Sequence, residues 1–143
     1  PIGDQFSKNI VLKPALSLKA RVTLIRQVPT GTGVSYGHTF VTDRPSTLAV
    51  VGIGYADGVA RALSGKISVL IEGKLFPQVG SITMDQLVVD ITGYPSIKPG
   101  TVVTLLGSDQ NYCLSPYQWS ELSGSIPWEI LCSFKYRLPR VIV

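Results

Sequence analysis

The chain has 143 residues, a length that suits one domain with a sizeable hydrophobic core. Hydrophobic residues make up 45% of it and charged residues 15%, which excludes an intrinsically disordered protein, and no apolar run reaches the ~20 residues needed to span a bilayer. The net charge is +4, but the basic residues are scattered, so we expect no nucleic-acid surface; the excess would suit an anionic cofactor or a carboxylate substrate.

The residues that commonly bind metals are few and dispersed. His38 is the only histidine, and Cys113 and Cys132 lack a CxxC spacing. We therefore expect no zinc site and no disulfide scaffold, and predict that the two cysteines are buried free thiols.

The first third of the chain predicts a lead-in, a strand and a loop. Residues 1–11 show no pattern and read as a lead-in. Between 16 and 28 apolar and polar residues alternate, which predicts a half-buried strand of period two. The glycine-rich loop over 29–33 lacks the phosphate-binding spacing and no helical pattern follows it, so we interpret it as a turn.

The middle of the chain predicts short strands separated by glycine- and proline-containing turns. The strands are expected at 39–42, 47–53, 67–71, 75–79, 87–91 and 101–106, with one or two helical turns at 58–64. Turns at ~8–12 residue spacing are typical of small barrels.

Two helices and a final strand are expected near the C-terminus. Ser115, Gln118 and Gly124 provide a capping box and a stop signal for a first helix. Ser125 is expected to cap a second, and 138–143 reads as a strand. The predicted fold is mainly β: a small closed or nearly closed β-barrel with two short helices near the C-terminus.

Three polar islands interrupt the apolar runs, at Val34–Gly37, Gly54–Gly58 and Met84–Gln86. Such islands present side chains at the rims of a strand scaffold. A tyrosine can act as an acid or as a base, so Tyr36 is a candidate for proton transfer. From chemistry alone, Tyr36 and Tyr55 are more often amphipathic aromatics at the edge of a core.

Nearly the whole chain, from about Leu12 to Val143, resembles the C-terminal β-domain of alanine racemase, a pyridoxal-phosphate enzyme. Tyr55 follows Tyr36 by nineteen residues, as in that family. The matching stretches are Leu12–Leu18, Val34–Gly37, Gly54–Gly58, Met84–Gln86 and Arg137–Val141. The resemblance makes residues 1–143 one such domain, with 1–11 as a lead-in from a missing N-terminal barrel domain.

The resemblance implies roles for individual residues. Tyr36 stands at the position of the tyrosine that exchanges a proton on one face of the substrate, in the active site of the partner subunit. The other positions are Tyr55, Met84 and Asp85 near the substrate, Arg61 at the entrance, and Trp128 where many members have a tyrosine that binds the cofactor phosphate. Ser81 stands where some members carry an entrance arginine.

The resemblance also implies what the chain lacks. The lysine that holds pyridoxal phosphate belongs to the family's N-terminal domain, and no lysine here lies in that motif. The chain is therefore expected to be inactive alone and to need that domain and a homodimer partner, in a cytoplasmic enzyme that interconverts L- and D-alanine.

Two alternatives stay open on the sequence. Composition and strand pattern alone also allow a non-catalytic β-barrel binding or dimerisation module. The other is a domain of a related pyridoxal-phosphate racemase or decarboxylase that acts on another amino acid, although the motifs at Ser35–Gly37 and Met84–Gln86 favour alanine.

Overall fold

A computed structural model describes residues 14–142 of the chain. The predicted lead-in at 1–11, the start of the first matching stretch at 12–13, and Val143 lie outside the described residues.

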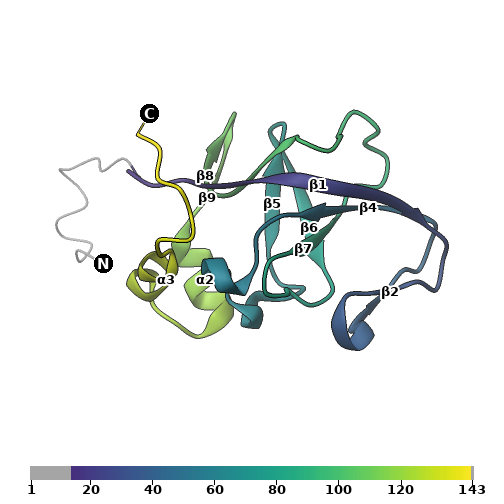
Figure 1. Ribbon diagram of the computed structural model, residues 1–143, viewed down its shortest axis with the longest axis horizontal. Coiled ribbons are helices and arrows are strands. Elements are labelled where there is room, and N and C mark those ends of the chain that lie inside the picture. The colour runs from purple at the N-terminus through teal and green to yellow at the C-terminus, as the bar shows by residue number, and fades with distance from the viewer. Residues whose placement is uncertain (1–13, 143) are drawn as a thin grey trace.

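The architecture is a closed antiparallel β-barrel (Figure 1). Around the barrel the order is β1 (Leu18–Val28), β4 (Ser46–Val51), β7 (Leu87–Asp90), β6 (Lys74–Val79), β5 (Ser68–Ile71) and β8 (Val102–Asp109). The barrel closes because β1 pairs with β4 along one part of its length and with β8 along another. The predicted mainly β fold with a closed barrel and two late helices is confirmed.

The long strand β1 contains an irregularity that the alternating sequence pattern did not predict. The alternation of buried and exposed residues holds from Leu18 to Val22, and both of these side chains are buried in the core. The register then shifts between Val22 and Leu24, and Leu24 is exposed. This β-bulge bends the strand between its two partners, so the second half of the expected alternation is wrong.

Two helices lie side by side at one end of the barrel (Figure 1). The first, α2 (Pro116–Ser123), has the predicted capping box at Ser115 and ends at Gly124. The second, α3 (Pro127–Ser133), begins without a side-chain cap, so the predicted cap at Ser125 is wrong. The Ser125 hydroxyl instead donates to the carboxylate of Glu129.

The larger of two hydrophobic clusters fills the barrel and extends beneath the helices. Trp119 on α2 is fully buried and meets Phe134 edge to face, with ring centroids 6.4 Å apart. The apolar inner faces of the strands supply the rest, for example Ile53, Leu87 and Leu105. Burial of this apolar area is the main driving force for the fold.

The remaining elements are short. The helical turns expected at 58–64 reduce to one 3₁₀ helix, Arg61–Leu63, and two further 3₁₀ helices span Tyr36–His38 and Tyr55–Asp57. The strand expected at 39–42 is β3 (Phe40–Val41), which pairs with β2 (Gly33–Val34).

One strand was not predicted, and two other expectations are wrong. The structure adds β9 (Tyr112–Leu114), which forms a hairpin with β8. Residues 138–142 form no strand. Cys113 and Cys132 are free thiols, as expected, but both are exposed.

Candidate functional site

Tyr36 occupies a strained turn between the small strands β2 and β3. Ser35 has φ 63° and Gly37 has φ 72°. Both values lie in the left-handed region, which residues other than glycine seldom adopt. The Tyr36 side chain is 72% exposed. Such a costly conformation persists only where surrounding contacts hold it, and it presents the tyrosine ring to solvent.

Ser81 holds this turn through two hydrogen bonds. Its hydroxyl donates to the Tyr36 carbonyl at 2.9 Å, and its carbonyl accepts from the Ser35 hydroxyl at 2.7 Å. Ser81 is itself buried. The preceding Gly80 permits the close approach, since a Cβ there would lie 2.6 Å from the Val34 carbonyl oxygen. The serine therefore fixes the backbone of Tyr36.

Replacing Ser81 with alanine is expected to destabilise the protein by about 1 kcal/mol, because a buried hydroxyl bond is lost. The measurement is the urea-unfolding free energy of the protein that carries this domain. Ser96→Ala is the control, since the Ser96 hydroxyl makes only an exposed 3.4 Å contact with Glu72. Equal stability of the two variants would contradict the structural role of Ser81.

Tyr55 lies on the turn that follows β4, and this turn docks on the chain around Met84. The Tyr55 amide donates to the Thr83 carbonyl at 2.9 Å, and the Ala56 amide to the Met84 carbonyl at 3.0 Å. Gly54 makes the docking possible, because a Cβ there would lie 2.2 Å from the Thr83 oxygen. The two polar islands therefore form one unit.

Tyr36, Tyr55 and Arg61 line the same depression, with Ile82 as its apolar contribution. The depression is open and measures about 470 Å³. Residues from three separate segments thus meet at one surface. Because the surface is aromatic and open, it could be completed by another chain or domain.

The turn at Met84 and Asp85 offers two unused backbone donors. Met84 is 52% exposed. Among residues 14–142, no acceptor takes the amide N–H of Met84 or of Asp85. Adjacent free amides can bind a carboxylate without placing a bulky cation beside it.

Arg137 joins the Tyr55 turn to the Met84–Asp85 turn, a role that was not predicted from the sequence. Its Nε lies 3.2 Å from Asp57 Oδ1, and its Nη2 lies 2.6 Å from Asp85 Oδ1. The hydrogen bond that Arg137 donates to Asp85 and the negative charge of Asp57 raise the pKa of the Arg137 guanidinium above its ordinary value. The signal available in the sequence was only the closing Arg137–Val141 stretch.

Asp57 holds the Tyr55 turn through its carboxylate. Its Oδ2 accepts the Gly54 amide at 3.1 Å, while its Oδ1 faces Arg137. Asp57 is buried, and both of its carboxylate oxygens are engaged in these contacts. Neither oxygen is therefore free to take part in a reaction.

Trp128 does not line the depression shared by the tyrosines. It lies on α3 and is 52% exposed. Within residues 14–142, its indole N–H makes no hydrogen bond. The opposite end of α3 is tied to the Tyr55 turn, where the Ser133 hydroxyl donates to the Gly58 carbonyl at 2.9 Å.

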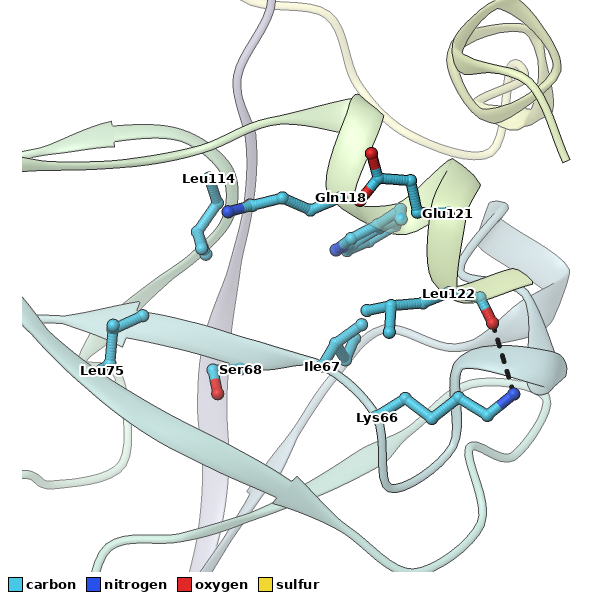
Figure 2. Close-up of a pocket in the computed structure, with 9 residues that line it drawn as sticks. Lys66, Ile67, Ser68, Leu75, Leu114, Gln118, Glu121 and Leu122 are labelled. Carbon is cyan, nitrogen blue, oxygen red and sulfur yellow. Dashed lines mark hydrogen bonds between the residues drawn. The ribbon is translucent and has the colours of Figure 1, made fainter. Parts of the chain in front are cut away.

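A groove of about 340 Å³ lies elsewhere, between α2 and the hairpin of β5 and β6 (Figure 2). Apolar side chains line much of it: Leu122 lies beside Ile67, and Leu75 lies farther along the groove, near Leu114. Lys66 donates to the Leu122 carbonyl near the end of α2 at 3.3 Å. The groove contains none of the candidate residues, so it is separate from the tyrosine depression.

Metal-ligand clusters and helices long and apolar enough to span a membrane are absent from the part of the chain that the structure describes. No three His, Cys, Asp or Glu side chains there gather as metal ligands would. No helix within residues 14–142 combines the length and apolar character needed to cross a bilayer.

Comparison with known proteins identifies the family to which the chain belongs. The family model described as "Alanine racemase, C-terminal domain" matches residues 15–142. A protein named alanine racemase from Prochlorococcus marinus is 72% identical over 143 residues, which are 100% of this chain and 37% of that protein. An alanine racemase from Synechocystis sp. is 51% identical over 132 residues, 92% of this chain and 36% of that protein.

Solved structures agree with the sequence relatives. The crystal structure of alanine racemase from Bacillus anthracis with bound L-Ala-P superposes with a TM-score of 0.91 at 37% identity, covering 100% of this chain and 37% of that one. A Clostridium difficile alanine racemase in complex with cycloserine gives a TM-score of 0.87 at 38% identity, covering 96% of this chain and 36% of that one. The chain thus spans a little over a third of the length of these relatives.

Proposed function

Because the chain belongs to the alanine racemase C-terminal domain family, we propose that it works as that domain of an alanine racemase. The parent enzyme would interconvert L- and D-alanine in the cytoplasm and supply D-alanine for peptidoglycan. The observation that carries this proposal is the placement of Tyr36, whose backbone is held by Ser81 while its ring stands exposed beside Tyr55 and Arg61.

In this proposal Tyr36 is the acid/base group for one face of the substrate. Racemisation removes the α-proton from one face and returns a proton to the other, which two groups on opposite faces can achieve. The phenolic oxygen of Tyr36 would hold or accept that proton. A free tyrosine titrates near pH ~10, so neighbours from the rest of the enzyme must tune it.

The Met84–Asp85 turn would bind the substrate carboxylate. Its two unused amide donors support this role. The side chain of Asp85 would not contact the carboxylate, because it is engaged by Arg137. Tyr55 and Arg61 would line the path by which alanine enters.

Pyridoxal phosphate would be the cofactor, held mainly by residues outside this chain. When bound, it supplies an electron sink for the carbanion that proton removal leaves. Trp128 fits a secondary contact only, because its exposed indole has a single donor for the phosphate. Among residues 14–142, no lysine lines the tyrosine depression.

The domain would act across a homodimer interface. An exposed proton-transfer residue cannot be tuned or shielded from water by this domain alone. We propose that the partner subunit's N-terminal barrel domain covers Tyr36, and that the chain's own N-terminal barrel domain completes the subunit. The relatives are long enough to include such a domain, because the chain covers only 37% of the first of them.

The chain alone is expected to show no alanine racemisation, even with added pyridoxal phosphate. The test measures racemisation by the chain alone and after co-expression with the N-terminal domain of a close relative. Activity in the combination only is the expected result. Racemisation by the chain alone would contradict the proposal, and an assembled, cofactor-bound but inactive combination would favour a non-catalytic barrel module instead.

A further inference from the structure

We propose that Arg137 is a positioning residue for the substrate carboxylate, acting through the Met84–Asp85 turn. The inference rests on the proposed function, since it assumes that this turn receives the carboxylate. It adds a residue far along the chain to the site and states what that residue controls: substrate binding rather than proton transfer.

The geometry is a bridge between two turns. The Arg137 guanidinium uses Nε toward Asp57 on the Tyr55 turn and Nη2 toward Asp85 on the Met84 turn, at 3.2 and 2.6 Å. Asp57 cannot move away, because it is buried and its second oxygen accepts the Gly54 amide. Arg137 therefore anchors the more exposed Asp85 to the buried Asp57.

Charge gives Arg137 a second effect. A bare Asp85 carboxylate beside the free Met84 and Asp85 amides would repel an incoming carboxylate. With Arg137 the cluster of Asp57, Asp85 and Arg137 carries one net negative charge, whereas without it the cluster carries two. The guanidinium thus offsets the charge that most disfavours substrate at this turn.

Arginine suits this position better than lysine. Its planar fork can direct separate N–H groups at two carboxylates, whereas an ammonium acts as a single point charge. Arg137→Lys should therefore keep the charge and lose the defined bridge. Arg137→Met should remove both while retaining a long apolar stem.

The chain offers a matched control at Arg44. Its guanidinium also bridges two carboxylates, with Nη1 3.2 Å from Asp43 and Nη2 3.0 Å from Asp90. Its side chain is exposed to a similar degree, at 57% compared with 48% for Arg137. Neither carboxylate lies on a turn assigned to substrate, so Arg44→Met removes the same kind of bridge away from the site.

The experiment uses the full-length enzyme that carries this domain. It measures KM and kcat for alanine, and the inhibition constant of propionate, which has the carboxylate of alanine without its amine. Arg137→Met should raise KM and the propionate constant together by about tenfold, with kcat changed by less than about threefold. For Arg137→Lys, both KM and the propionate constant should lie between those of Arg137→Met and wild type. Arg44→Met should leave both constants within about twofold of wild type.

Two outcomes would overturn the inference. One is a KM and propionate constant in Arg137→Met no higher than in Arg44→Met. The other is a fall in kcat alone, which would assign Arg137 to proton transfer. If Arg137→Met does not accumulate as folded protein, a wild-type KM in Arg137→Lys would equally overturn the bridge. Failure of the proposed function is distinguishable from failure of this inference. It would show as full racemase activity in Tyr36→Phe, independently of the kinetic constants of the Arg137 variants.

Discussion

Replacing Tyr36 with phenylalanine in the full-length enzyme is expected to lower kcat for alanine racemisation by about 10²–10⁴-fold, the usual contribution of a general acid–base group. The change removes one oxygen atom. Within residues 14–142 that oxygen makes no hydrogen bond, and the ring is 72% exposed. The fold should therefore be unaffected, so the loss of rate would report chemistry.

Isotope exchange can assign the missing step to one face of the substrate. In deuterium oxide, the Tyr36→Phe enzyme should still exchange the α-proton of one alanine enantiomer, with retention, through the base on the other face. Exchange of the opposite enantiomer should fall with racemisation. Nuclear magnetic resonance of the α-proton signal measures both.

Tyr112→Phe is the matched control. Tyr112 is also an exposed tyrosine, but it lies on β9, away from the depression. Its removal should leave kcat within about twofold. If Tyr36→Phe behaves like Tyr112→Phe, with activity within a few-fold of wild type, Tyr36 is not the acid/base group.

Replacing Gly54 with alanine is expected to destabilise the full-length protein by about 3 kcal/mol, an overpacking cost at the upper end of the usual range. The new Cβ would lie 2.2 Å from the Thr83 oxygen and 2.4 Å from the Met84 oxygen. These are backbone atoms, so the clash can be relieved only by separating the two turns. The melting temperature from calorimetry measures the loss, and racemisation should fall with it.

Gly93→Ala separates this steric effect from backbone strain. Gly93 has φ +86° but nothing within 4 Å of an added Cβ, whereas Gly54 has φ −151°, which any residue adopts. Gly93→Ala should therefore cost only about 1 kcal/mol, from the left-handed conformation. A smaller loss for Gly54→Ala than for Gly93→Ala would contradict the close docking of the two turns.

Local sequence signals predicted several elements correctly. The capping box at Ser115 and Gln118 and the stop at Gly124 predicted α2, because these interactions are made within one turn of helix. The hairpin of β5 and β6 followed from two apolar runs around a glycine turn. The motif resemblance, rather than periodicity, implied the site roles of Tyr36, Tyr55, Met84 and Asp85.

Other features depended on partners distant in sequence. The bulge in β1 arises because one strand must pair with both β4 and β8 as the barrel closes. Residues 138–142 form no strand, although Val141 and Ile142 are β-branched, because no strand of the barrel pairs with them. Pattern alone carries no information about which strand edges remain free.

The amino-acid sequence by itself determined the class of the fold, the positions of most strands and the first late helix, because hydrophobic period, glycine turns and caps act over a few residues. Only the tertiary structure decided that Ser81 holds the Tyr36 backbone and that Arg137 bridges Asp57 to Asp85. Ser81 lies 45 positions from Tyr36, and Arg137 lies 80 positions from Asp57 and 52 from Asp85. These contacts therefore exist only once the barrel has closed.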